Sequence, residues 1–387
     1  MIDMITAYSY EIDDVDVAVM GLLSQLDMDI KLRKNAAGIV HCPYEFIEAG
    51  VTEALQSKLP FPLVGSVTVS NSVNGAIRER QLSVCVLTSD DVEFVARAID
   101  ISGLDDELLD EEKYMFLDDR DDDPSLILMW VPINVHSQGK GIRLYEKFSK
   151  ALTKTPIFGG MPVTNEINMQ KAVNIHMGRP EKNSLVTLSL YGDVDLEFFQ
   201  IDPEDLEDHY LSLDAIVTDA DGVLIKAINE MNAVECLKHI GLVSDENIAG
   251  IESTPFVVRK GKSQAKLNIC HYATPEGYLS MGGTVEEGST LDLCVLTKAK
   301  ILEGTAKIMS WVKSSERRNR LMLYSGISRN WLLGMDNVRE IKIVNSNMTN
   351  DCPFIFAYSY SIFVPRRASD GNWENAQQNG VIAMLSM

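Results

Sequence analysis

Two aspartates in one short segment are the clearest candidates for catalysis. Asp219 and Asp221 follow the apolar residues 215–217 and precede Gly222. Carboxylates at this spacing could act as a nucleophile and a general acid/base in phosphoryl transfer, with the glycine letting the chain turn over the phosphate. The same residues also predict a β-hairpin, because Asp-Gly between two apolar runs is a strong turn signal.

Residues 214–224 resemble the first motif of the haloacid-dehalogenase-type phosphohydrolases. That family also requires a Ser or Thr at a strand end, a lysine, and an acidic pair that holds magnesium. These groups cannot be placed in order after Gly222, so we interpret the segment as a hairpin. A phosphohydrolase that uses Asp219 and Asp221 stays open as an alternative, and we otherwise expect no catalytic residues.

Histidine and cysteine adjoin at His41-Cys42 and at Cys270-His271, each at the end of a strand-like run. Either imidazole, His41 or His271, could be an axial ligand of haem. The alternative is an imidazole that is hydrogen-bonded at a strand end, with no cofactor. No Cys-x-x-Cys pair is present, so the sequence predicts no structural metal.

Two glycine-containing loops are candidates for ligand binding. The loops at residues 65–71 and 159–165 both combine unhindered backbone with hydroxyl and amide groups at the end of a strand. Ligands in α/β sheets favour that edge, although small residues there also occur simply because a tight turn avoids a clash. The candidate binding residues are Gly65, Ser66, Thr68, Gly159, Gly160 and Thr164.

The elements around these loops follow one order, used three times: a strand, a helix, a strand led by proline, and a final strand. The predicted strands lie at residues 37–40, 61–66 and 82–87, then at 125–131, 156–160 and 185–190, and finally at 320–325, 353–357 and 380–385. Apolar residues at helical spacing separate the first two strands of each group. The pattern indicates internal duplication in an α/β fold whose mixed sheets are flanked by helices.

Composition limits the domain organisation and the partners. A chain of 387 residues exceeds the usual size of one core, so we expect two lobes, residues 1–211 and 212–387. The formal charge of −21 disfavours nucleic acid and anionic membranes as partners. No apolar run is long enough to span a membrane, and the first ten residues do not resemble a signal peptide, so we expect a cytoplasmic protein. The acidic residues 105–123 predict a solvated connector.

Several segments spread over nearly the whole chain resemble the FIST family of intracellular sensory proteins. In the part that resembles the N-terminal FIST domain these are residues 62–68 and 157–160, and in the part that resembles the C-terminal domain they are residues 221–237, 279–289 and 321–329. The resemblance implies a sensor of a small molecule, with amino acids or their derivatives as the usual ligands. It also implies output through a partner such as a histidine kinase, or through a homodimer.

The resemblance adds a second group of candidate residues and shows where this chain departs from the family pattern. The family arginine is retained as Arg329, and two tyrosines and an asparagine are retained as Tyr358, Tyr360 and Asn379. We expect the arginine to bind an anionic group of the ligand. A cysteine, a glutamate, a histidine and a threonine of the family pattern are replaced. Two further alternatives therefore stay open: a haem-binding sensor of nitric oxide, as some relatives are, and a scaffold that no longer binds a ligand.

Overall fold

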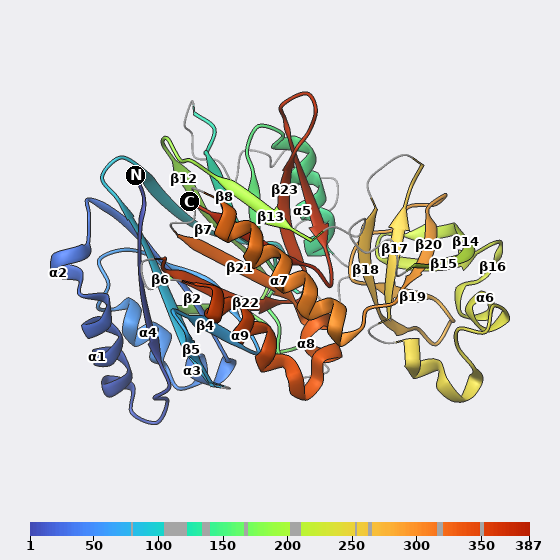
Figure 1. Cartoon of the computed structure of the whole chain (residues 1–387), viewed down its shortest axis with the longest axis horizontal. Coiled ribbons are helices and arrows are strands. Elements are labelled where there is room, and N and C mark those ends of the chain that lie inside the picture. Colours follow the sequence, from blue (N-terminus) through green and yellow to red (C-terminus); the bar gives the residue numbers. More distant parts are fainter. Residues whose placement is uncertain are drawn as a thin grey trace.

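The computed structural model describes residues 1–78, 80–103, 122–133, 140–165, 169–201, 210–251, 254–261, 265–315, 320–348 and 352–387. These residues form a large body of three six-stranded sheets and a smaller barrel at one end of it (Figure 1). Residues 105–121 of the predicted acidic connector lie outside the described residues. Within the described residues, no helix has both the length and the apolar character needed to cross a membrane.

The first sheet shows the strand order that the whole body follows. Its strands are, in order, β1 (Asp3–Ser9), β6 (Leu82–Ser89), β2 (Asn35–Cys42), β3 (Leu63–Val67), β10 (Asn174–His176) and β11 (Arg179–Glu181). Only the central pair, β2 and β3, is parallel, and all other neighbours are antiparallel. The helices between β2 and β3 allow this parallel pairing.

The other two sheets of the body repeat this order. The second contains β7 (Glu93–Asp100), β12 (Ser184–Tyr191), β8 (Leu126–Trp130), β9 (Ile157–Gly160), β23 (Ile362–Arg367) and β24 (Trp373–Gln378). The third contains β13 (Glu197–Gln200), β25 (Ile382–Ser386), β21 (Leu321–Gly326), β22 (Phe354–Ser359), β4 (Asn71–Val73) and β5 (Ala76–Ile77). Their parallel pairs are β8 with β9 and β21 with β22. We call the segments that contain β2 and β3, β8 and β9, and β21 and β22 the first, second and third units.

The three units exchange hairpins. The hairpin β10–β11 of the second unit completes the sheet of the first, β23–β24 of the third completes the second, and β4–β5 of the first completes the third. The body is therefore one closed ring of pairings, to which both ends of the chain contribute. The mixed sheets predicted from the sequence are confirmed, whereas duplication of the sequence stays an interpretation.

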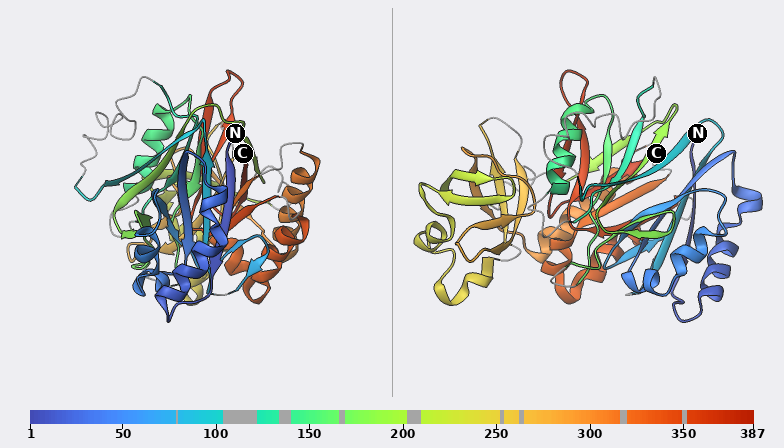
Figure 2. Two further views of the ribbon diagram at one scale, coloured as in Figure 1. Left: turned by 90° about the vertical axis from the view of Figure 1, so that its left-hand side faces the viewer. Right: turned by 180° about the vertical axis from the view of Figure 1, so that it is seen from behind.

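Each sheet of the body is buried on both faces. In β2, Ile39 packs into the central core between the sheets, and its neighbour Val40 packs into an outer core beneath the first helices. This explains the nearly continuous apolar character of the strands. Figure 2 shows the helices outside the sheets. Among the described residues they are α1 (Val15–Leu26), α2 (Met28–Lys31), α3 (Tyr44–Glu48) and α4 (Val51–Gln56) on the first unit, α5 (Lys140–Ala151) on the second, and α7 (Lys298–Ser314), α8 (Ile327–Leu333) and α9 (Asn337–Asn347) on the third.

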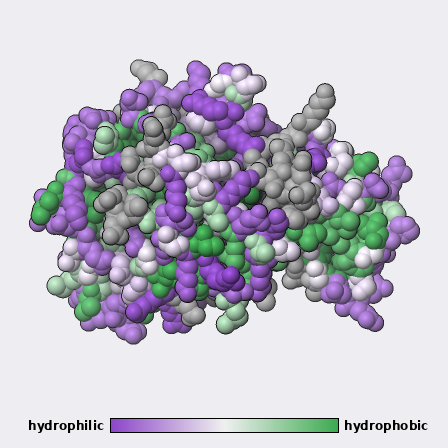
Figure 3. Space-filling model, in the orientation of Figure 1, coloured by the Kyte–Doolittle hydropathy of each residue, from purple (hydrophilic) through white to green (hydrophobic). Residues whose placement is uncertain are grey.

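The smaller part is a closed β-barrel. Its strands are β14 (Tyr210–Asp221), β20 (Thr290–Cys294), β17 (Pro255–Arg259), β18 (Lys266–Ala273), β19 (Leu279–Met281) and β15 (Leu224–Ile228). The barrel closes because β15 also pairs with β14. The short strand β16 (Met231–Asn232) extends β15, and α6 (Ala233–His239) packs into the same core. Figure 3 shows hydrophobic side chains gathered on one face of the barrel.

The chain enters the barrel close to residue 212 but does not stay there. After β20, residues 298–387 return to the body and supply α7, the third unit and the hairpin β23–β24. The division in space therefore runs between barrel and body, and the predicted division into residues 1–211 and 212–387 stays a prediction. Strand pairing over long sequence distances produces this arrangement.

Candidate functional site

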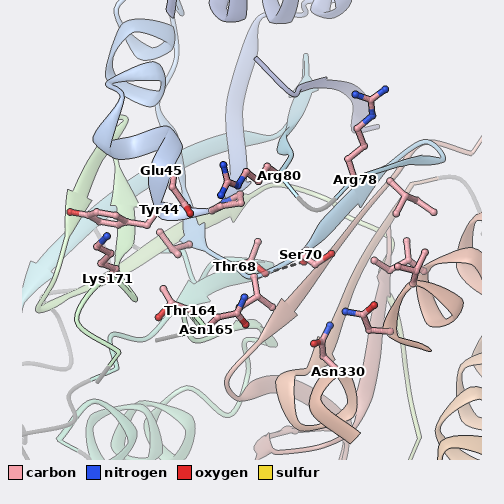
Figure 4. A pocket seen from close by; sticks show the side chains of 17 residues that line it. Tyr44, Glu45, Thr68, Ser70, Arg78, Arg80, Thr164, Asn165, Lys171 and Asn330 are labelled. Atoms are coloured by element: carbon pink, nitrogen blue, oxygen red, sulfur yellow. Dashed lines mark hydrogen bonds between the residues drawn. The ribbon is translucent and has the colours of Figure 1, made fainter. Parts of the chain in front are cut away.

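The two glycine-containing loops lie next to each other. Each follows the second strand of a parallel pair, β3 or β9, and both line a cavity of about 620 Å³, within the size range of small-molecule sites. Helices α8 and α9 of the third unit supply another wall (Figure 4). We call this the junction cavity; it is lined by residues 43–45, 67–70, 77, 78, 80, 164, 165, 171, 330, 337, 338 and 341.

The described residues that line the junction cavity carry excess positive charge although the protein is strongly acidic. Arg78, Arg80 and Lys171 are the basic residues among them, and Glu45 is the one acidic residue. Lys171 Nζ lies 5.3 Å from the centroid of the Tyr44 ring, in a cation–π contact. Basic side chains around a concave surface raise the local concentration of anions.

Asn330 is a buried amide in the wall of this cavity. It is 8% exposed, and Figure 4 shows it on the side of the cavity away from Lys171. Within the part of the chain that the structure describes, its Nδ2 makes no hydrogen bond of normal geometry. The amide lies near the Tyr358 hydroxyl, and this contact lowers the pKa of Tyr358, against the larger rise that burial causes. A buried amide donor without a full partner is available to a ligand.

The predicted loop residues divide into two groups. Thr68 and Thr164 line the junction cavity. The others lie behind it: a Cβ on Gly65 would overlap the carbonyl oxygen of Val40, and one on Gly159 would overlap that of Met129. Both glycines have positive φ, 152° and 153°. They are therefore explained by the close approach of two parallel strands.

Ser66 and Gly160 also lie behind the cavity and contact other residues of the protein. Ser66 Oγ lies 3.2 Å from His41 Nδ1, and a Cβ on Gly160 would overlap the Ser359 hydroxyl. Thr68 Oγ1 donates to the carbonyl oxygen of Tyr358 at 2.8 Å and so connects the first loop to the third unit.

Arg329, which we expected to bind an anionic group of the ligand, has a partner within the protein. It is 3% exposed, and its Nη2 lies 2.7 Å from Oε1 of the fully buried Glu340. Its Nη2 also donates to Thr305 Oγ1 and to the carbonyl oxygen of Ile301. The guanidinium is thus engaged on several sides, and a ligand would have to displace Glu340 to reach it.

Tyr358 belongs to the same buried cluster. Its hydroxyl donates to Glu340 Oε2 at 2.8 Å, and Ser325 Oγ donates to the same oxygen at 3.0 Å. Burial, followed by the charge of Glu340, raises the pKa of Tyr358 well above its usual value. Sequence reasoning missed Glu340; its only signal was its position four residues before the buried Val344 on one helix face.

Tyr360 and Asn379 lie at a second cavity, between the barrel and the body. Tyr360 lines it and stacks on His271, with 4.5 Å between ring centroids and 21° between planes. Asn379 is buried behind it and donates to the Ser361 hydroxyl and to the carbonyl oxygen of Tyr360. The predicted residues therefore occupy three places rather than one site.

His41 lies at the centre of the body, where the three units meet. Its Nε2 is 2.9 Å from the Tyr324 hydroxyl, which also accepts from Trp130 Nε1 at 3.2 Å. Its Nδ1 faces Ser66, and burial lowers the pKa of His41 to about 4, so the ring is neutral at pH 7. With both ring nitrogens engaged and 1% exposure, His41 does not fit a haem.

His271 fits a haem no better as it stands. A Cβ built on Gly282 would lie 2.7 Å from His271 Nε2, so the glycine backbone covers that nitrogen. Burial lowers the pKa of His271 to about 4, and the ring is neutral.

The two aspartates considered for catalysis lie on the barrel surface. Asp221 pairs with Leu224, Gly222 has a φ of 60°, and Asp221 forms an ion pair with Lys226 at 3.4 Å. The hairpin is confirmed, but its two central residues are Gly222 and Val223 rather than the predicted Asp221 and Gly222, because Asp221 pairs with Leu224. The positive φ falls at the first central position, Gly222. Among the described residues, no group of three or more His, Cys, Asp or Glu gathers to hold a metal.

The chain folds into an α/β body of mixed sheets that is interrupted by a β-barrel. The model of the FIST N domain matches residues 36–231, and that of the FIST C domain matches residues 233–361. The chain belongs to the FIST family, a family of sensory domains in signal transduction, and the predicted resemblance is confirmed. No curated protein matches the chain. The two matches meet between β16 and α6, within the barrel.

Proposed function

We propose that this protein senses a small anionic molecule, which binds in the junction cavity, and reports it to a partner protein such as a histidine kinase. The observation that carries the proposal is the convergence of loops 65–71 and 159–165 on one cavity together with three basic side chains. Membership of a sensory family supports the role in signal transduction.

The chemistry of the lining favours a carboxylate ligand with further polar groups. Arg80 and Lys171 would supply charge-assisted hydrogen bonds to the carboxylate. The amides of Asn165, Asn330 and Asn337 would bind hydroxyl, amino or carbonyl groups. An amino acid or a derivative of one, which the family resemblance implies, meets both requirements.

A ligand in this cavity would contact all three units of the body. The lining includes Thr68 of the first unit, Thr164 of the second and Asn330 of the third. A molecule that bridges these elements changes the balance between conformations in which they are closer or farther apart. Such a change is what a partner protein would recognise.

The experiment is a ligand screen followed by calorimetry. We expect a carboxylate among acetate, pyruvate, L-aspartate and L-glutamate to raise the melting temperature, whereas acetamide does not. Arg80→Ala and Lys171→Ala should each weaken binding of that carboxylate about tenfold, the loss of one charge-assisted hydrogen bond. Lys58→Ala, which removes an exposed positive charge outside the cavity, is the matched control.

Two results would contradict the proposal. One is equal affinity in the wild type and in both cavity variants. The other is the absence of any stabilising carboxylate, which would favour the non-binding scaffold. Magnesium-dependent turnover of phosphate esters that disappears in Asp219→Asn would instead support the phosphohydrolase alternative, and a Soret band after addition of haemin would support the haem sensor.

A further inference from the structure

The second cavity lies between the barrel and the body and has about 570 Å³. We call it the barrel cavity. The second unit contributes residues 132, 133, 141, 142 and 161, the third unit contributes Tyr360, and the barrel contributes residues 223, 224, 271, 272, 274, 276, 278 and 280–282. The proposed anion site does not use any of these residues.

Aromatic side chains form much of the wall of the barrel cavity. Tyr272, Tyr278 and Tyr360 line the cavity, and the imidazole of His271 stacks on Tyr360. The face of a phenol ring is electron-rich and attracts cations. His271 adds no opposing charge, because burial lowers its pKa to about 4 and leaves it neutral at pH 7. Several rings around one volume are the arrangement with which proteins bind organic ammonium groups.

The formal charge of the barrel cavity is opposite to that of the junction cavity. Glu276 lines it, and a hydrogen bond with Thr274 lowers the pKa of this carboxyl, so it is ionised at neutral pH. None of the described residues that line the barrel cavity is a lysine or an arginine. An anion would meet no charged partner here, whereas a cation would meet both the rings and a carboxylate.

The remaining walls are apolar. Ile133, Ile142 and Met161 on the body and Val223 and Leu224 on the barrel leave room for a hydrophobic ligand part. A small inorganic cation would leave this surface empty, and a flat ring would cover it. Apolar walls with a few placed polar groups are typical of small-molecule sites.

We propose that the barrel cavity is a second ligand site, which binds an organic cation with a flat apolar body, such as an arylalkylamine. The ammonium group lies between the tyrosine rings and Glu276, and the ring lies against the aliphatic wall. This site is separate from the anion site, so the protein takes two ligands of opposite charge.

The position of the site gives the second ligand a structural effect. Barrel and body are joined by hydrogen bonds from Gln377 Nε2 to the Gly282 carbonyl (2.6 Å), from the Leu267 amide to Gln378 Oε1 (3.2 Å) and from the Asn379 amide to the Leu267 carbonyl (3.0 Å). Two of these reach β18 and one reaches the segment after β19, the strands that carry His271 and Ser280. A ligand between the two parts adds contacts to the same interface and holds the barrel on the body.

The experiment uses three probes that share an indole ring and differ in charge. Calorimetry on the full chain should show that tryptamine, a cation, binds about tenfold more tightly than the neutral tryptophol, and that the anion indole-3-acetate binds more weakly still at this site. Glu276→Gln should weaken tryptamine binding about fivefold and leave tryptophol unchanged. Tyr272→Ala, at a partly exposed ring, should weaken tryptamine binding about threefold.

Matched variants separate this site from the junction cavity. Glu287→Gln removes an exposed carboxylate elsewhere on the barrel and should leave tryptamine binding unchanged, as should Arg80→Ala. The proposal is overturned if tryptophol binds as tightly as tryptamine, if no indole binds, or if Glu276→Gln has no effect. Loss of tryptamine binding in Arg80→Ala would place the amine in the junction cavity and also overturn it, whereas failure of carboxylate binding alone would affect only the proposed function.

Discussion

The first and third units differ in how they accommodate basic side chains at the ends of their parallel strands. At the end of the first parallel pair, β2 and β3, Arg80 of the first unit lines an open cavity together with Lys171 of the second. At the end of the third parallel pair, β21 and β22, Arg329 is buried and forms an ion pair with Glu340 of α9. One unit therefore leaves positive charge facing a cavity, and the other neutralises it within the protein.

The buried cluster shows how this fold binds a carboxylate. Glu340 accepts hydrogen bonds from a guanidinium and from the hydroxyls of Thr305, Ser325 and Tyr358. The junction cavity offers similar chemistry, with guanidinium, ammonium, hydroxyl and amide groups, but among the described residues that line it one carboxylate, Glu45, stands against three basic side chains. The comparison supports a ligand carboxylate at the first unit and a structural role for Arg329 at the third.

Removing the internal carboxylate should have the largest effect. We expect Glu340→Ala to lower the free energy of unfolding by about 3–5 kcal/mol, because it leaves the Arg329 guanidinium buried without its counter-charge. Urea unfolding followed by circular dichroism measures this. A loss below about 1 kcal/mol would show that water or a mobile ligand can replace Glu340, and would weaken the contrast between the units.

Substitution of the strand-end glycines should come next. Gly65→Ala and Gly159→Ala should each destabilise the protein by about 3 kcal/mol or more, since the new methyl group overlaps a carbonyl oxygen of the neighbouring strand. Gly75→Ala is the control, because Gly75 also has positive φ, 88°, but has open space around it. We expect about 1 kcal/mol there. Equal losses at all three positions would contradict the explanation from close strand approach.

Low pH should lower the free energy of unfolding through His41, which lies where the three units meet. His41 has a folded-state pKa of about 4, below the 6.5 of an exposed imidazole, so the unfolded chain binds the extra proton between these values. The contribution of His41 is therefore complete above pH 6.5 and is lost as the pH falls toward 4, by about 2 kcal/mol at pH 5. His41→Gln should reduce this slope in urea unfolding, whereas His239→Gln, at an exposed residue, should keep it.

The smallest effect on stability should come from a substitution in the junction cavity. Arg80→Ala removes an exposed side chain and should change the free energy of unfolding by less than about 0.5 kcal/mol, in contrast with Glu340→Ala. The same variant should weaken ligand binding. A large loss of stability in Arg80→Ala would show that the junction cavity, like the third unit, uses its charge to hold the fold.

Local patterns predicted much of the fold and part of the site. The helix over Val15–Leu26, capped by Asp14, and the proline-led strands follow from residue spacing. The two loops were predicted at the ends of strands, and the structure shows that these strands, β3 and β9, belong to parallel pairs. The role of Arg329 was not predictable in this way, because its partner lies 11 residues away on another helix and its burial depends on how α7, α8 and α9 pack together.

The sequence by itself determined the family, the order of strands and helices in each unit, and the small residues where strands approach closely, since all of these depend on neighbours along the chain. Only the tertiary structure decided that β4 pairs with β22, that β23 pairs with β9, and that the barrel interrupts the body. These pairings join residues far apart in sequence, and they depend on the closing of a common core rather than on local preference. The same long-range packing separated an open, basic cavity at the first unit from a neutralised ion pair at the third.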